Sequence, residues 1–143
     1  MKNNGNNGKK KLFLGIKFHE DYRNREIIEK ISEYSNASDM ECVVTARDFE
    51  NWGERRYPQR KLMRMVFSEI DKSDALILEF SEKGVGMAIE AGYAFSKGIP
   101  VFVIAKENSD ISTTFEGVTH GIYFYKDVSE LPRLIKKIKE QID

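Results

Sequence analysis

Cysteine, histidine and proline are scarce in this sequence. Cys42 is the only cysteine, His19 and His120 are the only histidines, and there are three prolines among 143 residues. A single cysteine excludes an intramolecular disulfide framework, and two distant histidines lack the spacing of a structural zinc site. We therefore expect neither a metal nor a cofactor, and no proline-rich linker that divides the chain.

The sequence also lacks an excess of charge and a long hydrophobic run. Lys and Arg number 23, Asp and Glu number 23, and the formal net charge is zero. Proteins that coat nucleic acid or anionic membranes normally carry a basic excess. No apolar run approaches the roughly 18–20 residues of a membrane span, and the N-terminus has no signal-peptide core. We expect a cytoplasmic protein that binds neither nucleic acid nor a membrane.

Short apolar runs alternate with segments that have the period of a helix. The predicted strands are 12–16, 42–45, 75–78, 101–105 and 122–125, and the predicted helices are 21–34, 58–70, 87–97 and 128–138. Continuous apolar strands between helices are typical of a parallel sheet that is covered on both faces. The pattern predicts an α/β fold, a three-layer, doubly wound, five-stranded parallel sheet of flavodoxin-like or Rossmann-like order with helices on both faces. Residues 1–11, rich in Asn, Gly and Lys, predict a disordered tail before a single domain at 12–143.

Missing motifs exclude several common uses of this fold. The sequence has no G-x-x-x-x-G-K-[ST] phosphate-binding loop, and its first strand is followed neither by G-x-G-x-x-G nor by the acid pair of a receiver domain. Ligands of doubly wound folds bind beyond the carboxyl ends of the strands. The loops to consider are therefore 17–20, 47–52 and 81–87.

The most informative segment runs from Gly84 to Ala94. Gly84 and Gly86 allow the backbone to approach a ligand and precede a helix. Glu90 lies about one turn inside that predicted helix, where we expect the helix dipole to hold its carboxylate ionised. An ionised carboxylate beside a sugar-sized pocket can attack an anomeric carbon or stabilise an oxocarbenium ion. The preference of acidic side chains for the first turn of a helix explains the same residue without any function.

This segment also resembles a family signature. Gly86-Met87-Ala88-Ile89-Glu90-Ala91-Gly92-Tyr93-Ala94, followed by Gly98-Ile99-Pro100-Val101, is similar to the G-x-A-x-E-x-G-Y-A…G-x-P-V signature of the nucleoside 2-deoxyribosyltransferases. The related 2′-deoxynucleoside 5′-monophosphate N-hydrolases share it in part, with a shorter Gly-to-Glu spacing. The resemblance implies that Glu90 is the nucleophile that takes the deoxyribosyl group from the base. It also implies a small-molecule nucleoside or nucleotide partner and a homodimer or higher homo-oligomer, since in the family a neighbouring subunit often completes each pocket.

The sequence departs from the family at the positions that transfer a proton to the base and bind the 5′-phosphate. The resemblance implies an aspartate eight residues before Asp74, which helps to transfer a proton to the base, but Val66 stands there. The hydrolases bind the 5′-phosphate through a serine after the third strand, and Ser81 is the only candidate for this role. Lys17 stands in the first loop in place of the usual polar residues.

The remaining candidates for substrate binding also lie at the ends of predicted strands. Asp48 and Trp52 follow the second strand and are candidates to close over a base, although a packing role fits Trp52 equally well. The predicted site consists of Glu90 as the catalytic residue and of the substrate-binding residues Gly15, Ile16, Lys17, Phe18, Asp48, Trp52, Ser81, Gly84, Gly86 and Met87.

Three functions stay open on the sequence. The first is an enzyme that cleaves or transfers at the N-glycosidic bond of a (deoxy)nucleoside or nucleoside monophosphate. The second is a TIR-like domain that cleaves NAD, because such domains also use a glutamate carried on a helix. The third is a non-catalytic module that binds or senses nucleotides, and Val66 is its best support.

Overall fold

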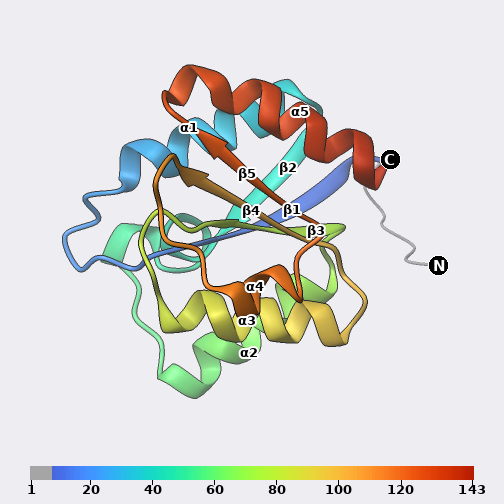
Figure 1. Ribbon diagram of the computed structural model, residues 1–143. Helices are drawn as coiled ribbons and strands as arrows, with labels where there is room; N and C mark the ends of the chain where they lie inside the picture. The colour runs from blue at the N-terminus through green and yellow to red at the C-terminus, as the bar shows by residue number, and fades with distance from the viewer. Residues whose placement is uncertain (1–7) are drawn as a thin grey trace.

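The computed structural model describes residues 8–143, which form one five-stranded sheet between two layers of helices (Figure 1). The strand order is β2-β1-β3-β4-β5, and every neighbouring pair is parallel. The strands are β1 (Lys10–Ile16), β2 (Met40–Val44), β3 (Ala75–Glu79), β4 (Val101–Lys106) and β5 (Gly121–Tyr125). The predicted fold class is confirmed.

The helices divide between the two faces of the sheet, as Figure 1 shows. Helices α1 (Arg25–Ala37) and α5 (Leu131–Ile142) cover one face, and α2 (Gln59–Asp71), α3 (Val85–Ser96) and the short α4 (Thr113–Glu116) cover the other. Three further turns complete the described elements, namely η1 (Thr45–Phe49, π-helical), η2 (Asn51–Gly53, 3₁₀) and η3 (Val128–Glu130, 3₁₀). None of the helices between residues 8 and 143 has the length and apolar character needed to cross a membrane.

Two separate hydrophobic cores arise because successive side chains of a strand point to opposite faces. In β1, Leu12 and Leu14 pack with α1 and α5, whereas Phe13 packs with α2 and α3. All three of these side chains are buried. Strands that are buried on both faces read as continuous apolar runs, which is why the sequence predicted them well.

The chain reverses its direction of winding between β1 and β3. It places β2 on one side of β1, and then returns to place β3 on the other side and β4 and β5 beyond it. The helices after β1 and β3 therefore lie on opposite faces of the sheet. This arrangement leaves a crevice beyond the carboxyl ends of β1 and β3, where ligands of such sheets bind.

Several predicted boundaries are corrected by the structure. Strand β1 begins at Lys10, inside the predicted tail 1–11, while residues 1–7 of that prediction lie outside the described residues. Helix α1 begins at Arg25 and not at residue 21, because Tyr22 has a φ of 51°, which interrupts a right-handed helix. Helix α3 begins at Val85, two residues before the predicted start, so that Glu90 falls in its second turn.

Candidate active site

A pocket of about 870 Å³ occupies the crevice at the carboxyl end of β1. Its walls come from the loop after β1, the turn after β2, the first turns of α2 and the start of α3. Pockets for small molecules and cofactors typically measure about 300–1,000 Å³. The volume is therefore sufficient for a ligand of nucleotide size.

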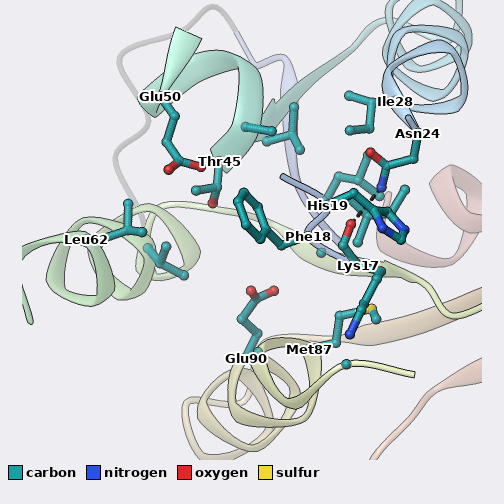
Figure 2. Close-up of a pocket in the computed structure, with 18 of the residues that line it drawn as sticks. Lys17, Phe18, His19, Asn24, Ile28, Thr45, Glu50, Leu62, Met87 and Glu90 are labelled. Carbon is teal, nitrogen blue, oxygen red and sulfur yellow. Dashed lines mark hydrogen bonds between the residues drawn. The ribbon is translucent and has the colours of Figure 1, made fainter. Parts of the chain in front are cut away.

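Glu90 enters this pocket from α3 and lies against Gly15 at the end of β1 (Figure 2). A Cβ atom on Gly15 would lie 2.5 Å from Glu90 Oε2 and 2.5 Å from Leu78 Cδ2. No larger residue fits at this position without moving the carboxyl group, because real Cβ atoms do not approach other atoms so closely. Because Gly15 has no side chain, the Glu90 carboxyl group can occupy the space beside the end of β1.

The Glu90 carboxyl lacks the partners that normally accompany a buried acid. Its Oε2 atom is buried and has no hydrogen-bond partner among the described residues. Burial raises the pKa of Glu90 to about 8, because a low-dielectric environment disfavours the charged form. Burial thus favours the neutral form of Glu90, in contrast to the ionised carboxylate that the helix dipole led us to expect. The dipole acts mainly within the first turn of a helix, and Glu90 lies in the second turn, where desolvation dominates.

A second carboxyl group faces the pocket from the turn after β2. Glu50 follows η1 and is 6% exposed, and its Oε2 atom lies 3.8 Å from Nη1 of Arg56. Burial raises the pKa of Glu50, and the positive charge of Arg56 opposes this increase in part. Tyr22 also lines the pocket, and its buried hydroxyl has no hydrogen-bond partner in the described part of the chain.

Helix α2 offers apolar side chains to the pocket at and around the position where the family resemblance implies an acid. Val66 is 3% exposed and lines the pocket, together with Leu62 and Met63 from the same helix. The position at which the resemblance implies an aspartate thus does face the ligand space, and here it offers no proton. This apolar wall also contributes to the desolvation of the pocket.

Most of the predicted substrate-binding residues meet at this pocket. The structure brings together around Glu90 those from the end of β1 and the start of α3, namely Gly15, Ile16, Lys17, Phe18, Gly84, Gly86 and Met87. Asp48, Trp52 and Ser81 lie outside the lining of this pocket. Whether any of these residues binds a substrate stays a prediction.

Asp48 and Trp52 have structural contacts that explain their orientation. Asp48 Oδ2 accepts a hydrogen bond of 2.8 Å from the backbone N–H of Val44, at the end of β2. The Trp52 ring lies edge-on to Tyr22, with 5.9 Å between the ring centroids, and the Arg25 guanidinium lies 4.4 Å from the centroid of the Trp52 ring. Trp52 therefore forms part of the support behind the pocket wall.

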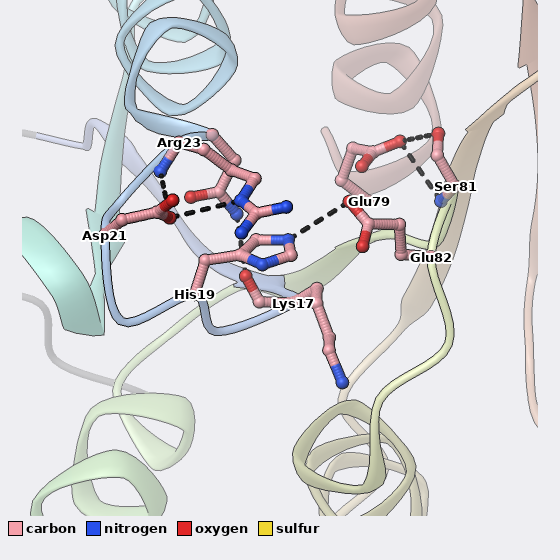
Figure 3. A network of polar contacts seen from close by, with 8 residues as sticks. Lys17, His19, Asp21, Arg23, Glu79, Ser81 and Glu82 are labelled. Atoms are coloured by element: carbon pink, nitrogen blue, oxygen red, sulfur yellow. Dashed lines mark hydrogen bonds and ion pairs between the residues drawn. The ribbon is translucent and has the colours of Figure 1, made fainter.

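Ser81 belongs to a second pocket of about 610 Å³, which shares Ile16, Lys17 and Asn24 with the first. Figure 3 shows the Ser81 side chain beside that of Glu79. The Ser81 hydroxyl donates to the buried Glu79 carboxylate and accepts a hydrogen bond of 2.9 Å from the Lys106 backbone N–H. Tyr125 donates a second hydroxyl hydrogen bond to Glu79, at 3.2 Å. Lys17 lines both pockets, and Ser81, the candidate for binding a 5′-phosphate, lines only the second.

The loops after β1 and β3 are joined beside the pocket by a polar contact. His19 Nε2 lies 3.1 Å from Glu82 Oε1, as Figure 3 shows. Asn24 donates a hydrogen bond of 2.7 Å to the Lys17 carbonyl and so fixes the loop after β1. These contacts give the rim of the pocket a defined shape.

Sequence reasoning did not identify Glu50 or Glu79 as site residues. Glu50 lies within the loop 47–52 that the sequence singled out, but an acidic residue in a polar loop carries no signal of burial. Glu79 ends β3, where a charged residue after four apolar ones reads as the exposed end of a strand. Both are nearly fully buried in the structure.

Comparisons with known proteins reveal similarity in structure. No protein-family model and no curated protein matches the sequence. The 2-deoxyribosyltransferase of the psychrotolerant bacterium Bacillus psychrosaccharolyticus matches with a TM-score of 0.69 and 14% identity, over 85% of this chain and 90% of that one. The CMP N-glycosidase BcmB of Clostridium botulinum matches with a TM-score of 0.62 and 16% identity, over 91% and 99%. BlsM matches with a TM-score of 0.71 and 15% identity, over 94% and 91%.

These similarities show the fold of the chain. The neighbours include a 2-deoxyribosyltransferase, the class of enzyme that the signature around Glu90 resembles. The likeness in fold and the likeness in the signature are consistent with each other.

Proposed function

We propose that this protein cleaves or transfers at the N-glycosidic bond of a nucleoside or nucleoside monophosphate, with Glu90 acting on the anomeric carbon. The observation that carries the proposal is Glu90, whose Oε2 atom is buried and has no hydrogen-bond partner within residues 8–143, at the floor of a pocket of nucleotide size. A buried acid with a strongly raised pKa in a cleft is typical of a functional site. The fold shared with a 2-deoxyribosyltransferase and a CMP N-glycosidase supports the same reaction class.

The proposed chemistry proceeds from the ionised form of Glu90, which is the minor form at neutral pH because burial raises the pKa of Glu90 to about 8. One carboxylate oxygen forms a bond to C1′ while the bond between C1′ and the base nitrogen breaks, and the electron pair of that bond leaves with the base. The base nitrogen takes up a proton, and a glycosyl ester on Glu90 results. Water then releases the free sugar, or a second base accepts the glycosyl group, and the carboxylate is restored.

The second pocket is proposed to extend the substrate site beyond the nucleoside. Lys17 and Ser81 border it, and Lys106 also lines it. Cationic side chains are common partners of a phosphate group, whereas the Ser81 hydroxyl already donates to Glu79. The two lysines therefore support the choice of nucleoside monophosphates as substrates.

The test is chromatography of the free base that is released from a panel of substrates. The panel contains deoxynucleosides, deoxynucleoside monophosphates, ribonucleotides and NAD, and the wild type is compared with Glu90→Gln. We expect release from one nucleoside or nucleotide class, lost by a factor of about 10³ or more in Glu90→Gln, because the amide cannot form the glycosyl ester. Thermal unfolding at pH 6 checks that the variant is folded.

Two outcomes would replace the proposal by the other functions. Release of nicotinamide alone would indicate the NAD-cleaving function. A folded protein that nucleotides stabilise against thermal unfolding, but that releases no base, would indicate a binding or sensing module. The valine at position 66 is the observation that favours this second candidate, because it removes an acid from the pocket wall.

A further inference from the structure

We infer that Glu50 is the acid that protonates the departing base. The α2 wall of the pocket cannot supply this proton, because it carries Val66 at the position where the family resemblance implies an aspartate. The inference rests on the proposed function, since it assigns the proton that the base needs in order to leave. It names a catalytic residue from the turn after β2, an element in which the sequence indicated only Asp48 and Trp52.

Glu50 and Glu90 direct their carboxyl groups into the same pocket from different walls, as Figure 2 shows. Glu90 comes from α3, and Glu50 comes from the turn between η1 and η2. A ligand held between them meets one carboxyl group at each side. Two carboxyl groups on either side of a scissile glycosidic bond are the arrangement that glycoside-cleaving enzymes use, one as nucleophile and the other as acid.

Backbone hydrogen bonds fix the position of Glu50 within the turn. Its N–H donates to the Thr45 carbonyl at 3.0 Å, and its carbonyl accepts from the N–H groups of Gly53 at 3.0 Å and Arg55 at 2.9 Å. The side chain is 8% exposed. Burying a charged group is costly unless the charge is compensated. A buried carboxyl group that faces a pocket is therefore a candidate for a functional role.

Burial and the charge of Arg56 have opposite effects on the protonation of Glu50. Arg56 lies 3.8 Å away and favours the ionised form, while burial favours the protonated form. Burial raises the pKa of the nearby Tyr22 hydroxyl, and the charge of Glu50 raises it further. A carboxyl group between these opposing influences can both give up a proton and take one back, which is what an acid and base residue requires.

The proton then moves in a closed cycle. As the bond between C1′ and the base breaks, Glu50 donates its proton to the base nitrogen that receives the electron pair, and becomes a carboxylate beside Arg56. In the second half of the reaction this carboxylate takes a proton from the attacking water, whose oxygen forms the new bond to C1′. The ester bond to Glu90 breaks, and both carboxyl groups return to their starting state.

The test compares Glu50→Gln with the wild type on two substrates that differ in the leaving base. The first is the natural substrate found in the base-release panel. The second is its analogue with a base that leaves without a proton or with less need of one, 5-fluorinated for a pyrimidine or N7-methylated for a purine. We expect Glu50→Gln to lower kcat about 10²–10⁴-fold on the natural substrate and by less than about tenfold on the analogue.

Two further variants control the comparison. Glu54→Gln removes an exposed acid from the same loop, and we expect unchanged rates on both substrates. Glu50→Asp keeps a carboxyl group in a shorter side chain, and we expect it to recover part of the rate on the natural substrate. Thermal unfolding confirms that each variant is folded. If Glu50→Gln does not fold, Glu50→Asp still allows the two substrates to be compared.

The outcomes separate this inference from the proposed function. Equal losses on both substrates would overturn the inference, because a group that only positions the substrate affects both alike. An unchanged rate in Glu50→Gln, with activity still lost in Glu90→Gln, would also overturn it and leave the proposed function intact. If the wild type releases no base from any substrate, both fail together.

Discussion

At the scale of single residues, the surroundings of Glu90 disfavour the charged form of its carboxyl group. Its Oε2 atom is buried beside Gly15, which has no side chain that could offer a hydrogen bond. Each unit of pKa corresponds to about 1.4 kcal/mol of free energy between the two protonation states. A pKa of about 8 corresponds to a decrease of at most several kcal/mol in the free energy of unfolding when Glu90 is ionised.

This cost predicts a dependence of stability on pH. Below the ordinary pKa of 4.5, Glu90 is neutral in both the folded and the unfolded chain and has no effect. Between 4.5 and about 8, the unfolded chain loses the proton while the folded chain keeps it, so the free energy of unfolding decreases as the pH rises. We expect Glu90→Gln, which carries no charge, to be more stable than the wild type by a few kcal/mol at pH 9, and similar to it at pH 4.

Urea unfolding from pH 4 to pH 9 measures this difference. Glu140→Gln, an exposed acid on α5, is the matched control and should follow the wild type across the range. If Glu90→Gln also follows the wild type, Glu90 is ionised in the folded protein at neutral pH and its burial is compensated by a partner such as water.

The sequence predicted Glu90 because its signal is local. The glycines before it and the helix around it are neighbours in the chain, and the family signature covers the same few residues. Glu50 carries no such signal. Its burial depends on how the turn after β2 folds back over the sheet, and no pattern of neighbouring residues records this.

At the scale of elements, the turn after β2 is the least regular part of the site. Three residues in a row, Asn51, Trp52 and Gly53, have φ values of 43°, 55° and 96°. Non-glycine residues in this left-handed region are uncommon and cost free energy, and they cluster at functional sites. The sequence predicted a polar, aromatic loop here, but not a backbone that turns Glu50 into the pocket.

Asp48 and Arg47 hold this turn to the rest of the fold. Asp48 Oδ2 accepts from the Val44 N–H at 2.8 Å, and the Arg47 guanidinium reaches Asp48 Oδ2 at 3.1 Å. Arg47 also donates to Ser32 on α1 at 2.6 Å and to the Cys42 carbonyl at 2.8 Å. The contacts connect η1 with both α1 and β2.

These contacts predict that Asp48 acts on stability rather than directly on a substrate. Asp48→Ala leaves the Val44 N–H without its acceptor, and we expect a loss of about 1–3 kcal/mol in the free energy of unfolding. We expect Asp48→Asn to lose less, because the amide oxygen still accepts from Val44. Urea unfolding with and without a nucleotide substrate measures both. A variant with unchanged stability and a raised KM would instead support the substrate-binding role that the sequence predicted.

At the scale of the whole molecule, the fold follows from patterns that a sequence displays directly. Parallel strands buried on both faces are continuous apolar runs, and the segments between them repeat with a helical period. Two positions show the limit of this reasoning. Tyr22 interrupts the predicted start of α1 through its backbone conformation, and Lys10 joins β1 although it is not apolar. Both depend on pairing and packing across the fold.

The outward face of α3 bears on the predicted homo-oligomer. Val85, Ile89 and Phe95 are 78%, 48% and 52% exposed, and Ala88 and Gly92 lie between them on the surface. No charged residue occurs among the exposed positions from Val85 to Ser96. A helix that is apolar on its exposed side as well as its buried side normally packs against a further partner.

We therefore predict that two copies of the chain associate through α3. An uncharged face can meet its own copy without repulsion between like charges, and the interface of a two-fold dimer is self-complementary. We expect Ile89→Glu to shift the protein to the monomer, because dimerisation would bury the new carboxylate without a partner. Light scattering after size-exclusion chromatography measures the mass, and Lys136→Glu, a charge change on the exposed side of α5, should leave it unchanged.

Since Val85 and Gly86 border both this face and the pocket, a partner on α3 lies beside the pocket mouth. The monomeric variant should therefore also release base more slowly, whereas a wild type that is monomeric at every concentration would contradict the prediction.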